Sequence, residues 1–206
     1  MPETAPAPLP SRTGASTRRS KETEVEVRLD LDRPAPPEIT TGLPFFDHML
    51  EQLGRHGGLA LAVVARGDLD VDAHHTVEDV GIVLGEALGA ALGDKAGIRR
   101  FASLSLPLDE ALIDVALDLS GRAYLRYAID LGTASLPLGT PPFDAQLAEE
   151  FWRAVVSSAG ITLHLALVEG RNPHHVLEAS FKGVGRALRD AVRVEGSEVP
   201  STKGML

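Results

Sequence analysis

Two short motifs of the form His-His-x-x-Glu hold four of the seven histidines in this 206-residue chain. The residues of the two motifs, 100 positions apart, are His74, His75 and Glu78, and His174, His175 and Glu178. At the start of a helix, the first histidine and the glutamate share one face, whereas the second histidine projects about 100° away. Each motif could therefore contribute imidazole and carboxylate groups to two centres. Donors of this kind, without sulfur, fit manganese, iron, zinc, nickel or cobalt, and donor type alone does not choose among these metals.

A single His-His-x-x-Glu motif could be an ordinary solvated helix start, because a glutamate is favourable near the positive end of the helix dipole. Two copies at equivalent places favour a shared chemical role. His48 lies ten residues before Gly58 and Glu150 ten residues before Gly160, and each glycine precedes an apolar stretch. We therefore interpret His48 as a further ligand, with packing beneath its own helix as the alternative. His164, within the second apolar stretch, is interpreted as a core or interface residue.

The composition excludes several classes of protein. The chain has no cysteine, so disulfides, thiol nucleophiles, cysteine-based zinc sites and iron–sulfur clusters are impossible. The longest apolar run, residues 59–65, is far shorter than the roughly 20 residues that span a bilayer. A formal net charge of −9, with no nucleic-acid motif, argues against nucleic-acid binding. We expect neither a membrane nor a nucleic acid as a partner.

The chain divides into a short tail and two related halves. Residues 1–20 hold four prolines among Ala, Thr and Ser and have no apolar stretch, which predicts a disordered tail that is not a signal peptide. We expect order to begin near Glu22. Because the motifs repeat, residues 21–133 are interpreted as the first half and residues 134–206 as the second, packed together as one compact unit.

The spacing of apolar residues predicts the elements that position the motifs. Helices are expected at residues 45–53, 76–92, 149–158 and 176–192. Strands are expected at residues 23–31, 59–64, 69–72, 111–119, 123–129 and 160–168. A turn at Ser120-Gly121 predicts that the strands on either side of it form a hairpin. The sequence thus predicts an α+β protein made of two duplicated halves.

Five segments of the chain closely resemble the imidazoleglycerol-phosphate dehydratase family. They are FFDHMLEQLGRHGG, DAHHTVEDVGIVLGEAL, DLSGRAYL, NPHHVLEASFKGVGRALR and PSTKGML, in this order between residue 45 and the C-terminus. The resemblance implies repeats of the ribosomal S5 domain 2 type, with helices packed between two mostly four-stranded sheets. It also implies a cytoplasmic homo-oligomer of 24 subunits, with active sites built from more than one chain. The implied activity is that of a hydro-lyase, which dehydrates D-erythro-imidazole-glycerol phosphate to imidazole-acetol phosphate in histidine biosynthesis.

The resemblance further implies two Mn²⁺ ions per active site, acting as Lewis acids and as a template for the substrate. The family's metal ligands fall on His48, His74, His75, Glu78, Glu150, His174, His175 and Glu178. The chain departs from the family pattern at Glu150, where a histidine is usual. A carboxylate also binds Mn²⁺, so we interpret Glu150 as a ligand. Alternatively, Glu150 or Glu149 faces solvent and one ion is held more weakly.

The resemblance also assigns the substrate's neighbours. Glu22 matches the family's acidic residue near the substrate and is the first choice for general acid and base, with Glu78 and Glu178 included in the catalytic set. The positions that match substrate-binding residues are Gln52, His56, Arg100, Arg122, Lys182, Ser201 and Lys203. Their cations suit a phosphate dianion, although any one of them alone could be a surface charge. Residues 200–206 have no apolar period, and we expect them to close over the ligand.

Two other functions fit the same residues. A di-metal phosphoesterase or hydrolase would also use histidine and carboxylate ligands with phosphate-binding arginines, but the chain has no aspartate-rich nucleophile motif. A metal-storing oligomer, with its motifs joining subunits, would bind metal without turnover. Titration with substrate distinguishes these possibilities.

Overall fold

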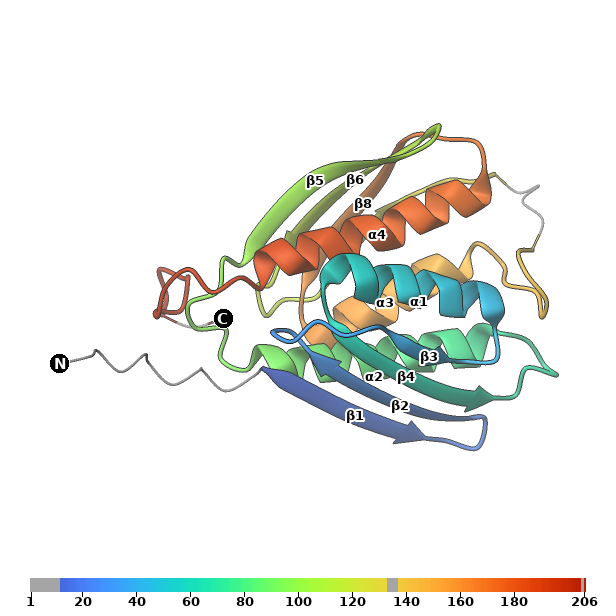
Figure 1. The fold of residues 1–206 in the computed structure, drawn as a ribbon, viewed down its shortest axis with the longest axis horizontal. Coiled ribbons are helices and arrows are strands. Elements are labelled where there is room, and N and C mark those ends of the chain that lie inside the picture. Colours follow the sequence, from blue (N-terminus) through green and yellow to red (C-terminus); the bar gives the residue numbers. More distant parts are fainter. Residues whose placement is uncertain (1–11, 133–136, 205) are drawn as a thin grey trace.

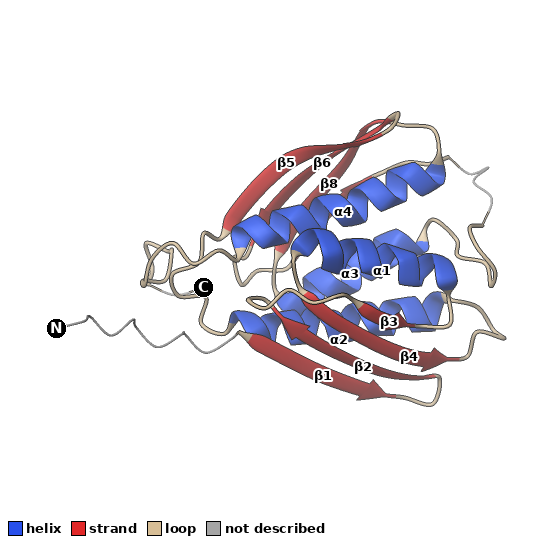
Figure 2. Ribbon diagram, in the orientation of Figure 1, coloured by secondary structure: helices blue, strands red, loops and turns tan. Residues whose placement is uncertain are grey.

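The computed structural model describes residues 12–132, 137–204 and 206, and over these residues four helices lie between two four-stranded sheets (Figures 1 and 2). The first half contains β1 (Thr13–Arg19), β2 (Thr23–Asp30), β3 (Glu38–Thr40), α1 (Pro44–Gly57), β4 (Ala60–Gly67) and α2 (His74–Leu92). The second half contains β5 (Phe101–Leu108), β6 (Ala111–Asp118), β7 (Tyr124–Ala128), α3 (Leu147–Ala159), β8 (Thr162–Glu169) and α4 (Pro173–Ala191). The predicted fold class is confirmed.

The two halves have the same topology. Their strand orders are β1-β2-β4-β3 and β5-β6-β8-β7. In each sheet the last two strands of this order, β4 with β3 and β8 with β7, are parallel. The repeated order places the junction between α2, which ends at Leu92, and β5, which begins at Phe101. The repeated motifs instead predict a boundary at residues 133 and 134, which lie outside the described residues. The difference arises because the sequence repeat is clearest late in each half, so three strands of the second half were assigned to the first.

Residues 13–19 form an edge strand, where the sequence pattern predicted a disordered tail. This strand buries only Gly14, so it carries almost no hydrophobic signal. A Cβ at Gly14 would lie 1.9 Å from the backbone oxygen of Ala87, which shows how closely β1 approaches α2. Arg18 adds an ion pair to α2, with its Nε atom 2.7 Å from a carboxylate oxygen of Asp79. The prediction was therefore wrong for this strand, while residues 1–11 lie outside the described part of the chain.

Two local predictions were also wrong for reasons of long-range pairing. β6 and β7 do not form a hairpin about Ser120-Gly121, because β8 lies between them in the sheet. Residues 69–72 form a turn rather than a strand, with the Val71 amide donating to the Asp68 carbonyl at 2.8 Å. A strand needs a partner, and the neighbouring edge of β4 is already taken by β3.

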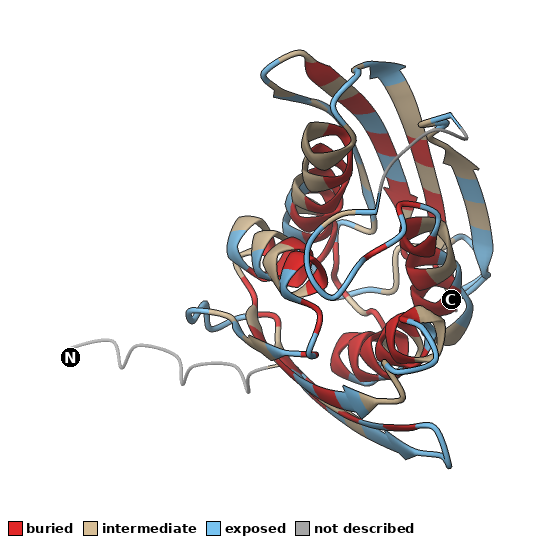
Figure 3. Ribbon diagram, turned by 90° about the vertical axis from the view of Figure 1, so that its right-hand side faces the viewer, coloured by how far each residue is buried: buried red, intermediate tan, exposed pale blue. Residues whose placement is uncertain are grey.

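Glycines allow the helices to pack in two close pairs, α1 on α4 and α2 on α3. A Cβ on Gly185 of α4 would lie 2.7 Å from the backbone oxygen of Leu53 on α1. A Cβ on Gly85 of α2 would lie 2.7 Å from the backbone oxygen of Val155 on α3. Figure 3 shows the buried residues on the helix and strand faces that meet between the sheets. The helix pairing brings a helix from one half against a helix from the other.

Over the residues that the structure describes, each helix is either too short or too polar to cross a membrane.

Candidate metal centre

His48 on α1 and His174 and Glu178 on α4 form a compact cluster of donor atoms. The Nε2 atoms of His48 and His174 lie 3.5 Å and 3.0 Å from the same carboxylate oxygen of Glu178. One ligand atom from each residue lies within 4.8 Å of the other two, and no other such group of three His, Cys, Asp or Glu residues occurs in the described ranges. The cluster therefore depends on the contact between α1 and α4, and it combines one residue of the first half with two of the second.

Local sequence fixes where α4 begins and hence which face its ligands share. The Asn172 side-chain oxygen accepts the His174 backbone N–H at 3.0 Å, and Pro173 occupies the first turn, where its missing N–H costs nothing. With the helix started there, His174 and Glu178 are one turn apart, so the predicted pairing of these two residues is confirmed. The ring of Phe45 meets the His174 ring edge-on, at 5.2 Å between centroids.

Nearby cations and burial set the charge of the cluster. Burial alone would raise the pKa of Glu178, but Lys182, whose Nζ lies 2.6 Å from the other carboxylate oxygen, and His48 together hold this pKa below its usual value. Burial lowers the pKa of His56, helped by the nearby charge of Lys182 and Arg186. Glu178 is thus an anion at neutral pH, which suits it to bind a cation.

Gln52 and Lys182, two of the predicted substrate-binding residues, belong to this same cluster. The Gln52 side-chain nitrogen lies 3.3 Å from Nδ1 of His48, so the other ring nitrogen, Nε2, is the one that faces Glu178. Lys182 follows Glu178 by one helical turn and is only 17% exposed. Gln52 and Lys182 therefore lie beside His48 and Glu178 within a single chain, and their role in substrate binding stays a prediction.

The first motif is not assembled in the same way. Within the described residues, His74, Glu78 and Glu150 form no compact group of donors. Glu150 lies on α3, which packs on α2 as α1 packs on α4. Its carboxylate is 3.6 Å from Nε of Arg153 on the same helix, and the side chain is 37% exposed. The role of Glu150 as a ligand therefore stays a prediction.

The second histidine of each motif is held by a carboxylate outside the motif. Nδ1 of His75 lies 3.0 Å from Asp68, and Nδ1 of His175 lies 2.7 Å from Glu110. These hydrogen bonds raise the pKa of both histidines, and the bond to His175 lowers the pKa of Glu110 to about 2. The rings of His174 and His175 are nearly perpendicular, at 80°, as expected if the two face different centres. Asp68 and Glu110 were missed by sequence reasoning.

Glu22, the predicted acid and base, lies in the turn between β1 and β2. Its side chain is 56% exposed, and its nearest carboxylate oxygen is 3.9 Å from Nδ1 of His75. Figure 1 places this turn at the same end of the molecule as the starts of α1, α2 and α4. Glu22 is thus near one metal-ligand candidate, and its carboxylate faces solvent.

Four further predicted phosphate-binding residues, Arg100, Arg122, Ser201 and Lys203, lie at the opposite end of the molecule, whereas His56, in the last turn of α1, is near Lys182. The backbone N–H of Arg100 donates to the carbonyl of Ala191, the last residue of α4, and its guanidinium donates to Asp118 and to the Pro200 carbonyl, each at 2.7 Å. Ser201 and Lys203 follow Pro200 in a turn. At about 1.5 Å per helical residue, Ala191 is roughly 20 Å along α4 from Glu178.

Arg122 lies on an exposed turn at this opposite end. The turn is next to Leu206, because a Cβ on the neighbouring Gly121 would lie 2.8 Å from the Leu206 carbonyl carbon. A single chain therefore keeps four of the predicted phosphate-binding residues, Arg100, Arg122, Ser201 and Lys203, apart from the His48–Glu178 cluster.

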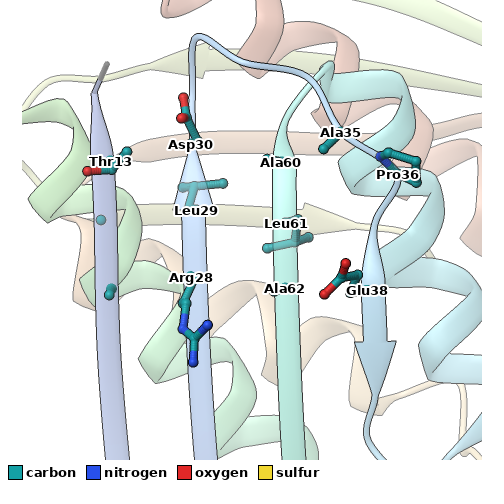
Figure 4. A pocket seen from close by; sticks show the side chains of 12 residues that line it. Thr13, Arg28, Leu29, Asp30, Ala35, Pro36, Glu38, Ala60, Leu61 and Ala62 are labelled. Atoms are coloured by element: carbon teal, nitrogen blue, oxygen red, sulfur yellow. The ribbon is translucent and has the colours of Figure 1, made fainter. Parts of the chain in front are cut away.

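A separate hollow of about 410 Å³ lies on the outer face of the first sheet (Figure 4). Its wall includes Leu29, Ala60 and Leu61, with Arg28 and Glu38 at the same face. It contains no histidine and shares no residue with the cluster.

The fold and the cluster together define a duplicated α+β protein whose two halves jointly present imidazole and carboxylate donors suited to a divalent metal. Residues 41–188 match the family model described as imidazoleglycerol-phosphate dehydratase. The chain belongs to this family.

Relatives with this name cover almost the whole chain. Imidazoleglycerol-phosphate dehydratase from Anaeromyxobacter sp. (strain K) is 54% identical over 95% of this chain and 93% of its own length. The one from Acidothermus cellulolyticus is 52% identical over 97% and 96%. Among solved structures, the dehydratase from Staphylococcus aureus has a TM-score of 0.78 and 38% identity over 88% of this chain and 99% of that chain. The Pyrococcus furiosus protein, in complex with (S)-C348, has a TM-score of 0.79 and 35% identity over 93% and 100%.

Proposed function

We propose that this protein dehydrates imidazole-glycerol phosphate to imidazole-acetol phosphate in histidine biosynthesis, in the cytoplasm, and that it uses two Mn²⁺ ions per active site to do so. Membership of the family makes it a hydro-lyase. The observation that carries the metal dependence is the cluster of His48, His174 and Glu178, in which donors from both halves converge.

The donor set of this cluster fits Mn²⁺. Two imidazole nitrogens and one ionised carboxylate oxygen lie close enough to share one ion, and such mixed nitrogen and oxygen sets are typical of divalent transition metals. We assign His48, His174 and Glu178 to one ion and His74, Glu78 and Glu150 to the second, with His75 and His175 as further ligands of the two ions through Nε2. When bound, Mn²⁺ supplies Lewis-acid polarisation and a fixed orientation for the substrate.

The chain's own residues must then move a proton and hold the phosphate. Glu22 is suited to the first role because its carboxylate is solvent-facing and is not held within hydrogen-bond distance of His75. Arg122, Ser201 and Lys203 are suited to the second role, and Arg100 joins them through the N–H groups that its bonds to Asp118 and Pro200 leave unused. Arginine presents a planar fork that matches phosphate oxygens, and lysine adds a compact charge.

The separation of these two groups of residues supports active sites shared between chains. In one chain the acid–base and metal-ligand candidates lie at one end of α4, and Arg100 lies at the other. A phosphorylated imidazole is far shorter than the roughly 20 Å between Ala191 and Glu178 along this helix. We therefore propose that a second chain supplies the phosphate-binding end, in a symmetric homo-oligomer of 24 subunits.

Removal of metal should loosen this assembly, because the proposed sites combine groups from different chains. Light scattering of the Mn²⁺-loaded protein should give a mass near that of 24 subunits of 21.8 kDa, and addition of a chelator should lower it. Restoring excess Mn²⁺ should restore the mass. A particle whose mass is unchanged by the chelator would contradict the proposed link between metal and assembly.

Turnover of imidazole-glycerol phosphate should require Mn²⁺, and Glu150→His should remain active if position 150 is a ligand. The assay follows the keto product for the wild type and the variant, each with Mn²⁺ and after EDTA treatment. Metal-dependent product from the wild type shows that a carboxylate at position 150 is compatible with turnover, whether or not the variant is also active. Product from the variant alone would mean that Glu150 has silenced the chain. Metal binding without turnover in either protein would favour metal storage.

A further inference from the structure

Each motif's second histidine is anchored through the same ring nitrogen by a carboxylate from a loop. Asp68 follows β4 and lies 3.0 Å from Nδ1 of His75. Glu110 lies in the turn between β5 and β6, 2.7 Å from Nδ1 of His175. In both cases Nδ1 is occupied and Nε2 is the ring nitrogen left for another partner, although Nε2 of His175 has the exposed carboxylate of Asp109 at 3.8 Å. A carboxylate on one nitrogen of a histidine fixes the ring's tautomer and direction when the other nitrogen binds a metal.

The two carboxylates come from different places in the duplicated fold. Gly67 and Gly170 occupy equivalent positions in the two halves. A Cβ on Gly67 would touch Thr23, the first residue of β2, and a Cβ on Gly170 would touch Ala111, the first residue of β6. Both glycines also approach the third residue of a motif, at Thr76 or Val176, and these positions are 100 apart like the motifs themselves.

This equivalence identifies the counterparts of the two anchors. The residue after Gly67 is Asp68, and the residue after Gly170 is Arg171. The residue before Thr23 is Glu22, and the residue before Ala111 is Glu110. The candidate acid and base of the first half, Glu22, is therefore the structural counterpart of Glu110, the histidine anchor of the second half.

The two glutamates occupy equivalent turns but are engaged differently. Glu110 is hydrogen-bonded to its histidine and also accepts the Asn172 backbone N–H at 2.9 Å. Glu22 remains 3.9 Å from His75 and is 56% exposed, whereas Glu110 is 35% exposed. This difference follows from the residues at positions 68 and 171. In the first half Asp68 already occupies Nδ1 of His75, whereas in the second half the equivalent residue is Arg171, which cannot accept a hydrogen bond from His175.

We propose that Asp68 and Glu110 are positioning residues for His75 and His175, and that Asp68, by anchoring His75, leaves Glu22 free to exchange a proton with the substrate. This inference rests on the proposed function, because it assigns Nε2 of both histidines to the metal sites. A merely structural role for Asp68 would affect folding stability alone.

Paired truncations test the proposal through Mn²⁺ binding as well as turnover. The proteins are the wild type, Asp68→Ala, Glu110→Ala, Glu22→Ala and the double variant Asp68→Ala with Glu22→Ala. Free Mn²⁺ is followed by its electron paramagnetic resonance signal during titration, without substrate. Thermal unfolding of each variant checks the fold. Asp68→Leu, which keeps the approximate shape of the side chain but removes both oxygen acceptors, replaces Asp68→Ala if the latter does not fold.

In Asp68→Ala, Glu22 is close enough to move onto His75, so Mn²⁺ affinity should fall by no more than about threefold, since Glu22 can supply the outer-shell hydrogen bond. Its kcat should nevertheless fall at least about tenfold with KM little changed, because the proton-transfer group is now engaged. Glu110→Ala and the double variant should each lower Mn²⁺ affinity by about 10–100-fold, as is typical when such a partner of a metal ligand is lost. Glu22→Ala alone should bind Mn²⁺ as the wild type does, because Asp68 still anchors His75.

Two results would overturn the proposal. A double variant that binds Mn²⁺ as tightly as the wild type would show that these carboxylates do not position histidine ligands. An unchanged kcat in a folded Asp68→Ala would show that Asp68 does not free Glu22. A wild type that neither binds Mn²⁺ nor turns over would instead contradict the proposed function, and the metal-facing role of both carboxylates with it.

Discussion

Glu178→Gln should lower Mn²⁺-dependent turnover by more than about 100-fold and weaken Mn²⁺ binding. Loss of a residue that only hydrogen-bonds to a metal ligand typically costs about 10–100-fold, and loss of a ligand itself should cost more. Glu178 is the centre of its cluster, because one of its oxygens faces both His48 and His174 and the other faces Lys182. Glutamine keeps the size of the side chain but removes its charge, and it turns one oxygen into a donor that opposes the Lys182 ammonium.

Turnover and Mn²⁺ affinity should be measured together for Glu178→Gln, beside Glu86→Gln as a matched control. Glu86 is an exposed carboxylate on α2, well away from the cluster, and it accepts a hydrogen bond from the Ser16 hydroxyl at 2.6 Å. The same loss in both variants, or full Mn²⁺-dependent activity in Glu178→Gln, would contradict a metal site at His48, His174 and Glu178.

The sequence predicted the elements whose signal is local. The helices that became α1, α2 and α4 each have a buried apolar stripe, and the repeated motif showed which two helix starts carry ligands. Strand β1 escaped prediction because an edge strand with one buried residue has no hydrophobic period. The placement of β8 between β6 and β7 could not be predicted either, because it depends on pairing between strands that are far apart in the sequence.

The same distinction applies to the site. The contact between His174 and Glu178 follows from their spacing on one helix, so sequence alone predicts it. The approach of His48 to Glu178 needs the packing of α1 on α4, which the sequence indicated only through the duplication. The contacts of Asp68 and Glu110 with their histidines come from loops, and recognising them required the three-dimensional equivalence of Gly67 and Gly170.

Gly185→Ala should destabilise the protein by about 1–3 kcal/mol, the usual cost of adding a methylene to a filled core, and should also weaken Mn²⁺ binding. The new methyl group would lie 2.7 Å from the carbonyl oxygen of Leu53 and 2.9 Å from the backbone nitrogen of Gly57. Backbone atoms of a helix cannot turn aside as a flexible side chain can. Helix α1 must therefore move away from α4, and His48 moves away from Glu178 with it.

The matched control is Gly89→Ala on α2, where the nearest atom to the new methyl group would be 4.0 Å away. This change should stabilise the protein by about 0.4–1 kcal/mol, because alanine loses less backbone entropy in a helix than glycine does. Denaturant unfolding and Mn²⁺ titration of both variants check the prediction. If Gly185→Ala were as stable as the control and bound Mn²⁺ like the wild type, the close approach of α1 and α4 would not be what holds the cluster together.

Gly85→Ala separates the two consequences, since Gly85 makes the equivalent close approach between α2 and α3. A Cβ there would lie 2.7 Å from both the Val155 carbonyl oxygen and the Ser158 side chain, so the loss of stability should match that of Gly185→Ala. The α1–α4 contact is untouched, and binding of the ion assigned to His48, His174 and Glu178 should be retained. If Gly185→Ala loses that ion and Gly85→Ala keeps it, binding of the ion depends on the contact between α1 and α4, the helices that carry its ligands. Equal loss from both variants would show that general destabilisation causes the effect.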